Sequence, residues 1–527
     1  MKELSKKVYK YLLYVVPLCL FLSYHPVITL GGDATMNFEL SVAEIWLVLF
    51  DIVGVVTMIV HKKLFKGFGR WWWLWILLPI WVTLSVIWSL NVTRGLLTAG
   101  LMWAIVVAGY VMWGLRGLLD DMFRRRWWMW FFGSTLAICV WCVVQCVMDL
   151  AGVGQECTLL CDGCTYRMFG FPHPNGFAIE PQFMGNLLLA PIIVSTWLYL
   201  NRKQTNKNLE WECSRDSHFH NRSVGARTKF QFRDSLRDCC KNDNGSHSLC
   251  SRFLLVCFLI IATTLFLTFS RGAIYAFVVG LLFLSGWVVA RDGKARCAVW
   301  KRVGLVWGMV VVSFVVALNV QGLMAQLGPT NDTYTTGVAK VLNQLSLGII
   351  DIREPNNSGG EVVEKSVENT EENGVENSSG GDVVVENGEA VFDGYVAEST
   401  DTRLRLTGAA MTIWKQDFKT AMVGVGLGGA GQALYNNDLS PAPKEIVQNE
   451  YASLLLEVGL IGATLAVLTL VLFIKIVIRS SVAGMVLALT VAYGVSLMFF
   501  SGLPNALQIY LMPIVLVVIG SVKTIKR

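Results

Sequence analysis

Residues 253–290 read FLLVCFLIIATTLFLTFSRGAIYAFVVGLLFLSGWVVA, two uncharged apolar runs separated by Arg271. Each run is close to the roughly 20 residues that an α-helix needs to cross the hydrocarbon core of a bilayer. Because backbone polar groups find no water inside the bilayer, such a run takes the form of a helix. This stretch therefore predicts two consecutive membrane crossings with a charged residue at the turn between them.

Similar apolar runs recur along the whole chain of 527 residues. They lie at 11–32, 40–60, 71–93, 95–115, 127–148, 181–201, 303–323 and 448–474, and the run 480–522 is long enough for two crossings with a turn at Gly502, Pro504 and Asn505. Only 16% of the residues are charged, compared with roughly a quarter in soluble proteins. We therefore predict an all-α polytopic integral membrane protein with about 12 transmembrane helices and one large, partly disordered outer loop.

The basic residues predict the orientation. Lys and Arg gather before the first crossing, in every second connection and after the last crossing, which places the N- and C-termini in the cytoplasm. The net charge of +6 reflects this bias, so we expect contact with membrane lipids and no nucleic-acid partner. The predicted location is the cytoplasmic (inner or plasma) membrane. Trp127 and Trp128, beside Arg126, are expected to anchor a helix at the lipid interface.

The chain divides into four regions. Residues 1–150 hold crossings one to five, 151–323 hold crossings six to nine with a basic cytoplasmic loop at 202–252, 324–446 form a large extracytoplasmic loop, and 447–527 hold the last three crossings. Within the large loop, the acidic segment 354–398 repeats Val-Glu-Asn and is expected to be disordered, because it has little apolar surface to bury. Its C-terminal flank, 402–446, regains apolar periodicity and is expected to fold against the membrane.

Charged residues at the edge of the bilayer are candidates for function, because desolvating a charge is costly. Arg271 is such a residue, and a planar guanidinium suits a phosphate ligand. Three further polar clusters fall on the predicted outer side, namely Arg167 to Gly176 with Glu180, Thr402 to Arg405 with the glycines from Gly424 to Gly429, and Gln448 to Tyr451 with Glu457. We expect one site built from loops that converge on this face. Glu457 is expected to orient its neighbours, and Asp51 to pair with a buried partner.

The spacing Cys157-x3-Cys161-x2-Cys164 resembles that of iron–sulfur radical enzymes, but it falls in a short outer loop. A disulfide between two of the three cysteines is the expected outcome, and the sequence leaves the pair open.

The order of these motifs resembles that of the O-antigen ligase and O-antigen polymerase superfamily. The motifs are Pro174-Asn175 before a helix, Ser270-Arg271-Gly272-Ala273, an arginine ahead of Gly424-x-Gly-x-Gly in a large outer loop, and Asn449 leading a helix that contains Gly459 and Gly462. The resemblance covers most of the chain from about residue 165, and the number of crossings extends it to the N-terminus.

The resemblance implies a glycosyl transfer outside the cytoplasmic membrane. The donor would be an undecaprenyl-diphosphate-linked glycan, and the acceptor a glycan, a lipid or a protein. No nucleotide sugar, cofactor or catalytic metal is implied. Arginines would stabilise the diphosphate as its negative charge grows. By position these are Arg271 and Arg405, with Arg403 as an alternate for Arg405 and Arg167 as a third candidate, and Asn175, Glu180 and Asn449 complete the expected substrate-binding set.

The acceptor hydroxyl must lose a proton, which requires a general base. In the ligases this base is thought to be a histidine just before the motif asparagine, where the present chain has Gln448, an amide that takes no proton at neutral pH. Glu450, two residues later, is the first substitute, and His173 or Glu180 are others if the loops meet. The choice between ligase and polymerase stays open.

Two other classes of function remain. Twelve crossings with buried charges also suit a transporter or lipid-glycan flippase, although such proteins commonly show two related halves and a site at mid-membrane. A scaffold or regulatory membrane protein would leave Arg271 and the glycine motifs without a purpose.

Overall fold

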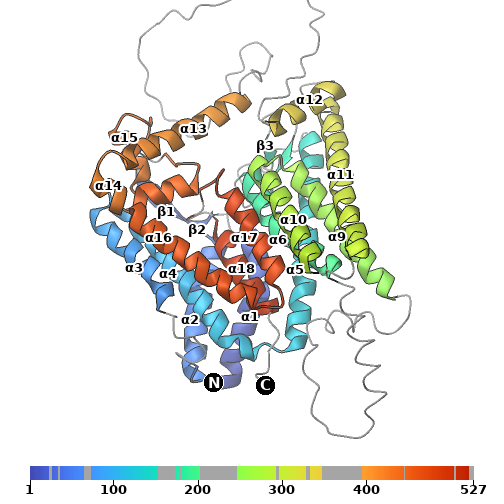
Figure 1. Ribbon diagram of the computed structural model, residues 1–527, viewed down its shortest axis with the longest axis horizontal. Helices are drawn as coiled ribbons and strands as arrows, with labels where there is room; N and C mark the ends of the chain where they lie inside the picture. Colours follow the sequence, from blue (N-terminus) through green and yellow to red (C-terminus); the bar gives the residue numbers. More distant parts are fainter. Residues whose placement is uncertain are drawn as a thin grey trace, which may run out of the picture.

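A computed structural model describes the protein over residues 1–22, 26–33, 36–63, 73–151, 165–166, 172–178, 180–201, 246–291, 296–327, 333–346, 395–443, 445–501, 503 and 506–520. These residues form a helical bundle with two small β-ribbons (Figure 1). The elements are α1 (Lys2–Phe21), β1 (Pro26–Asp33), β2 (Met36–Ser41), α2 (Val42–Val60), α3 (Leu74–Ser85), η1 (Val86–Trp88), α4 (Val92–Leu115), η2 (Arg116–Leu118), α5 (Asp121–Leu150), β3 (Thr165–Tyr166), β4 (His173–Pro174), α6 (Pro181–Leu200), α9 (Ser246–Leu267), α10 (Arg271–Arg291), α11 (Arg296–Leu327), α12 (Tyr334–Leu345), α13 (Tyr395–Trp414), α14 (Phe418–Val423), α15 (Ala430–Asn436), α16 (Glu450–Ile478), α17 (Ala483–Ser496) and α18 (Leu507–Gly520).

Every predicted crossing contains a helix. Within the described ranges, seven helices are long and apolar enough to span a membrane, and they lie at 42–60, 92–118, 121–150, 181–200, 271–291, 297–327 and 450–478. Shorter apolar helices at 74–88, 252–267, 483–496 and 507–520, together with α1, occupy the other predicted positions. The prediction of an all-α polytopic membrane protein is confirmed.

The first crossing differs from its prediction. The run 11–32 was expected to be one helix, but α1 ends at Phe21 and β1 begins at Pro26. Val27, Ile28 and Thr29, which follow Pro26, are β-branched residues that favour a strand. β1 pairs with β2 in an antiparallel ribbon, and β3 pairs with β4 in a second one.

Side-chain caps explain where several helices begin. Ser41 and Glu44 form a capping box at the start of α2, and Asn91 and Asp120 accept backbone hydrogen bonds at the starts of α4 and α5. Pro181 occupies the first position of α6, where its missing N–H costs nothing.

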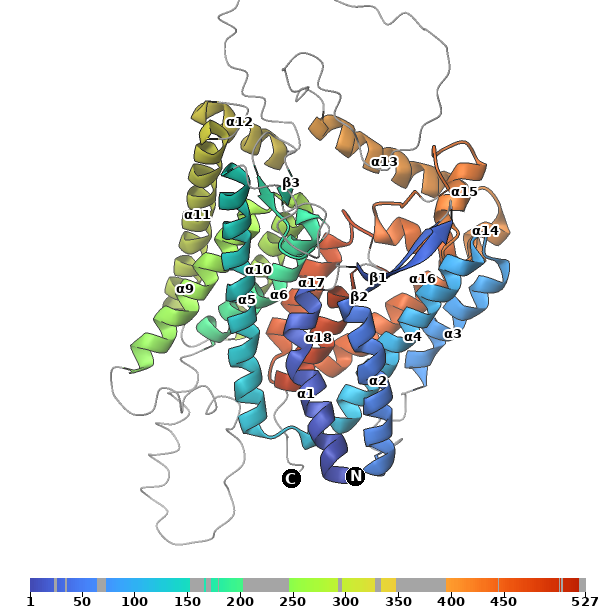
Figure 2. The ribbon, with the colours of Figure 1, turned by 180° about the vertical axis from the view of Figure 1, so that it is seen from behind.

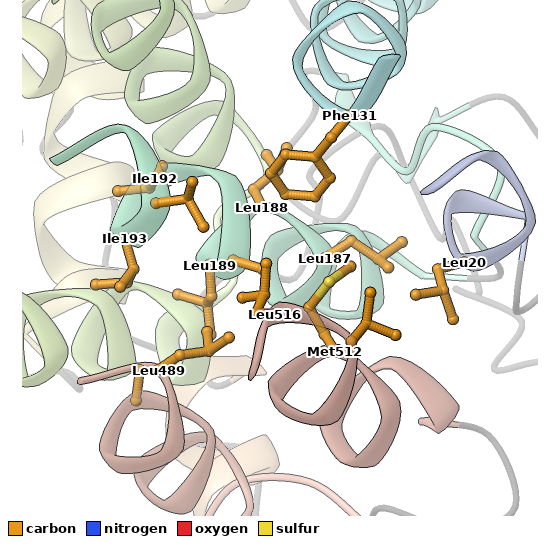
Figure 3. Close-up of a cluster of buried hydrophobic side chains, with 14 of the residues drawn as sticks. Leu20, Phe131, Leu187, Leu188, Leu189, Ile192, Ile193, Leu489, Met512 and Leu516 are labelled. Carbon is orange, nitrogen blue, oxygen red and sulfur yellow. The ribbon is translucent and has the colours of Figure 1, made fainter. Parts of the chain in front are cut away.

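α6 lies at the centre of the bundle. It is apolar on all sides, and most of its residues are buried, as expected for a helix surrounded by others. Figure 3 shows its leucines and isoleucines (Leu187, Leu188, Leu189, Ile192 and Ile193) among Leu20 of α1, Phe131 of α5, Leu489 of α17 and Met512 and Leu516 of α18. α16, by contrast, is largely exposed in its membrane-spanning part, as expected for a helix that faces lipid.

At the end of the bundle where α1 begins, the start of α5 contacts both α1 and the last turn of α18. Lys10 forms a 2.6 Å salt bridge with Asp120, and the Arg124 guanidinium donates to the carbonyl oxygen of Ile519 at 3.0 Å. Both ribbon views place α12, α13 and α15 at the opposite end (Figure 1 and Figure 2). Trp127 and Trp128 are buried, and Trp127 donates to the Leu13 carbonyl oxygen at 2.9 Å, so the prediction that they anchor the helix in lipid is wrong.

The C-terminal flank of the large loop forms α13, α14 and α15, which pack on α16. Their shared core consists of Leu406, Ala409, Ala410, Ile413, Ala430, Ala433, Leu434, Val447, Ala452 and Leu456. α13 begins at Tyr395, so it takes in the last four residues of the segment predicted to be disordered. The rest of that segment, and most of the basic loop 202–252, lies outside the described residues.

Candidate functional site

The loop that joins α17 to α18 fixes the first turn of α16. The backbone N–H of Glu450 donates to the carbonyl oxygen of Leu497 at 3.0 Å. The Ser501 hydroxyl donates to one oxygen of the Glu450 carboxylate at 3.3 Å, and the Tyr510 hydroxyl donates to the other at 3.1 Å. Glu450 is therefore held in a defined orientation by its backbone and by both carboxylate oxygens.

The same loop contacts the starts of α6 and α10. The rings of Phe500 and Phe183, on α6, lie 4.8 Å apart between centroids. Gly272, on α10, approaches so closely that a Cβ added to it would lie 2.9 Å from the Cβ of Phe499. The N-terminal turns of α6, α10 and α16 therefore converge on this loop, although they are far apart in the sequence.

Arg271 is the first residue of α10, and its side chain is only 7% exposed. Phe269 adopts a left-handed conformation with φ 56°, and the Ser270 hydroxyl accepts from the backbone N–H of Ala273 at 3.4 Å, which starts the helix. The N-terminus of a helix carries partial positive charge and favours anions. A buried arginine at this end adds to that charge, so the position suits an anionic ligand.

The Pro-His-Pro-Asn segment supports Arg271 through its neighbour. The His173 ring packs on the ring of Phe269 with centroids 4.8 Å apart. Burial lowers the pKa of His173 to about 3, so the imidazole stays neutral at physiological pH. Asn175 accepts from Gln145 on α5 at 3.1 Å, and the backbone N–H of Gly176 donates to Gln145 at 2.9 Å. These contacts give His173 and Asn175 a part in packing.

Gln145 was not among the residues singled out from the sequence. The signal that pointed to it is an amide in the middle of an apolar helix, where a polar group needs a partner.

Glu180 joins the start of α6 to α13. The Gln182 amide donates to its carboxylate at 2.7 Å. Burial raises the pKa of Glu180, and the positive charge of Arg403 opposes this rise. Arg405 is exposed and lies two residues further along the helix, about 200° around its axis. Of the two arginines that were alternates in sequence, Arg403 is therefore the one beside Glu180.

The glycine-rich segment, residues 424–429, forms hydrogen bonds with α16 close to a break in that helix. Val425 and Gly426 donate through their backbone N–H groups to the carbonyl oxygens of Leu456 and Glu457, both at 2.9 Å. The break itself is at Gly459, where φ is 65°. The glycine-rich segment expected to border the substrate site is thus hydrogen-bonded to α16.

A cavity of about 40 Å³ lies under Glu450. It is lined by Arg94, Thr98 and Met102 of α4, Leu427 and Gly428 of the glycine-rich segment, Glu450, Ser453, Leu454 and Glu457 of α16, and Ser501 and Leu503 of the loop between α17 and α18. Arg94 was missed at the sequence level. It separates the apolar runs 71–93 and 95–115 just as Arg271 separates its two runs, so the signal was present.

Other predicted residues lie elsewhere. Asn449 caps α16 by accepting from the backbone N–H groups of Tyr451 and Ala452. Gln448 is half-buried beside it. Arg167 and the three cysteines at 157, 161 and 164 are outside the described residues. Within the described ranges, no group of three or more His, Cys, Asp or Glu side chains is placed to hold a metal ion.

The fold and the site define a polytopic membrane protein with a charged site between converging loops at one end of its bundle. A family model described as O-Antigen ligase matches residues 256–467, from α9 into α16. This match supports the O-antigen ligase superfamily and confirms the resemblance seen in the sequence. The matched segment, less than half of the chain, supports an O-antigen ligase-like, glycan-transferring enzyme in general. No match is found among curated proteins or among solved structures.

Proposed function

We propose that the protein transfers or polymerises a glycan from an undecaprenyl-diphosphate-linked donor on the outer face of the cytoplasmic membrane. The observation that carries this proposal is the position of Arg271, buried at the N-terminus of α10. A guanidinium and a helix N-terminus together favour a diphosphate whose negative charge grows as the glycosidic bond breaks. Arginine would then do what a metal ion does in other phosphate-binding enzymes, with Arg403 or Arg405 as the second cation.

Glu450 is the proposed general base. Its carboxylate lies in the convergence of α6, α10 and α16 and borders the cavity below. In the reaction the acceptor oxygen attacks the anomeric carbon of the donor sugar and gives its proton to Glu450. The bond from that carbon to the phosphate oxygen breaks, and its electrons remain on the lipid diphosphate. Glu180, at the start of α6, and Arg403, whose charge acts on it, are proposed to orient the donor.

The test is to incubate purified protein in nanodiscs with a lipid-diphosphate oligosaccharide. A ladder of products indicates polymerisation, and a single shift of an added acceptor indicates ligation. We expect Arg271→Ala to reduce product formation by roughly 100-fold or more, the scale for losing one charge-stabilising group. Arg291→Ala, which removes an exposed arginine from the other end of the same helix, is the matched control and should keep the wild-type rate.

Glu450→Gln tests the base in the same assay, with Asp438→Asn as its control on an exposed turn. Arg271→Lys keeps the positive charge, so product formation by this variant shows that the protein folds with a substitution at this position. A wild-type rate in both Arg271→Ala and Glu450→Gln contradicts the proposed roles. In proteoliposomes, passage of a labelled lipid-linked glycan across the bilayer without any new product identifies a flippase instead.

A further inference from the structure

The cavity lined by Glu450 has several polar side chains that have no role in binding the donor. Its walls carry one guanidinium, two carboxylates and the hydroxyls of Thr98, Ser453 and Ser501. None of the arginines assigned to the diphosphate lines it. Arg271 lies on α10 and Arg403 on α13, whereas the cavity lies between α4 and α16. Glu450 is the residue shared by the two regions.

The guanidinium of Arg94 has N–H groups that can bind a ligand. It lies in the first turn of α4, where its backbone N–H donates to the cap residue Asn91 at 3.0 Å. Its guanidinium makes no hydrogen bond or salt bridge with any residue that the structure describes, although its charge attracts Glu457. Five N–H donors at the wall of a cavity are therefore available to a ligand.

Neighbouring donors fix the two acidic side chains. The backbone N–H groups of Gly428 and Ala430 donate to Glu457, and two hydroxyls donate to Glu450. A carboxylate has about four acceptor sites, so Glu457 can accept further hydrogen bonds. Sugar hydroxyls donate and accept at once, which matches a wall that carries both acidic side chains and a guanidinium.

Charge and size restrict the ligand further. Two acidic side chains and one guanidinium leave the wall without a net positive charge that would attract an anionic ligand. One water needs roughly 10–15 Å³ of cavity space, so a cavity of about 40 Å³ admits a hydroxyl-bearing edge and not a whole ring. The rest of the sugar must lie outside the cavity.

We propose that this cavity is the acceptor subsite, in which Arg94 and Glu457 hold the hydroxyl-bearing edge of a neutral sugar and place its attacking hydroxyl at Glu450. This inference rests on the proposed function and deepens it. The donor diphosphate is held on the α10 side of Glu450, and the acceptor on the α4 side. Arg94 and Glu457 are positioning residues, because the proton passes to Glu450.

The experiment measures the two substrates separately. The donor is the lipid-diphosphate oligosaccharide, and the acceptor probe is the free oligosaccharide released from that lipid by mild acid, with water as the competing acceptor. In Arg94→Gln we expect the KM for the oligosaccharide to rise roughly 10-fold to 100-fold, as for a lost charged hydrogen bond. The KM for the donor and its hydrolysis by water should stay within twofold of wild type. Glu457→Gln should have the same pattern.

Two further variants make the result unambiguous. Arg94→Lys keeps the positive charge but loses the paired N–H donors of the guanidinium, so it should give an intermediate KM for the acceptor. The same variant shows whether the protein folds with a substitution at this position. Arg126→Gln removes an exposed arginine from α5 and should leave both KM values unchanged. A rise in the donor KM, or an unchanged acceptor KM in Arg94→Gln, overturns the assignment of the cavity.

Failure of the acceptor subsite and failure of the proposed glycosyl transfer give different results. If wild-type protein consumes donor but never uses the oligosaccharide, the sugar subsite is wrong while the donor chemistry stands. If wild-type protein consumes no donor at all, the proposed function fails and the subsite fails with it.

Discussion

At the scale of the residue, the pair of Glu180 and Arg403 predicts a pH effect. Burial raises the pKa of Glu180, and Arg403 opposes that rise, so Arg403→Gln should raise this pKa further. If the ionised carboxylate orients the donor, activity falls as the pH drops through the pKa. The acidic limb of the profile of kcat/KM against pH should therefore move to higher pH in Arg403→Gln.

The control is Arg403→Lys, which keeps the charge and should leave the limb near its wild-type position. In a Glu180→Gln background, the substitution of Arg403 should no longer move the limb. A limb that shifts equally in both backgrounds would show that another group titrates. His173 contributes no limb near its ordinary pKa of 6.5, because it titrates at about 3 in the folded protein.

The sequence pointed to some of these residues and not to others. Arg271 was predictable because one charge between two apolar runs has no structural reason to be there. Arg94 has the same pattern and could have been found. The choice of Arg403 over Arg405 could not, because it depends on which face of α13 packs toward α6. The packing of His173 on Phe269 depends in the same way on tertiary contacts.

Among the helices, the break in α16 at Gly459 predicts how much an added methyl group at this position destabilises the fold. A Cβ at Gly459 would lie 2.3 Å from the carbonyl oxygen of Met422, and φ is 65°. A non-glycine residue in this region of backbone space costs about 1–3 kcal/mol even without a clash. Gly459→Ala should therefore lower the thermal unfolding midpoint in detergent by several degrees.

The matched control is Gly100→Ala on α4, where an added Cβ meets no atom within 4 Å. This variant should unfold within a degree or two of wild type. Equal midpoints for the two variants would mean that the break in α16 can straighten. Sequence alone showed glycines in both segments, but it did not show that Gly424 and Gly459 approach each other, since that contact joins residues far apart in the chain.

At the scale of the whole molecule, hydrophobic run length was sufficient to find the helices. Run 480–522 was divided correctly, with α17 ending at Ser496 and α18 beginning at Leu507 on either side of the predicted turn. Run 11–32 was not, because a count of uncharged residues ignores Pro26 and the strand that follows. The sequence predicted that the starts of α6, α10 and α16 share one membrane face. It did not predict that all three contact the same loop, because no local pattern encodes contacts between distant segments.

The molecule should lie in the membrane with α13 outside the cytoplasm. α12, α13 and α15 lie at the end opposite to the ends of α1 and α18 (Figure 1), and the basic residues predict that the termini are cytoplasmic. An epitope tag inserted between Gly380 and Gly381, in the acidic segment, should then be removed by protease added to intact spheroplasts. A second tag after Arg527 should survive until the membrane is permeabilised. The reverse pattern would place Arg271 on the cytoplasmic side, where a glycan exported on a lipid diphosphate cannot reach it, and would contradict the proposed reaction.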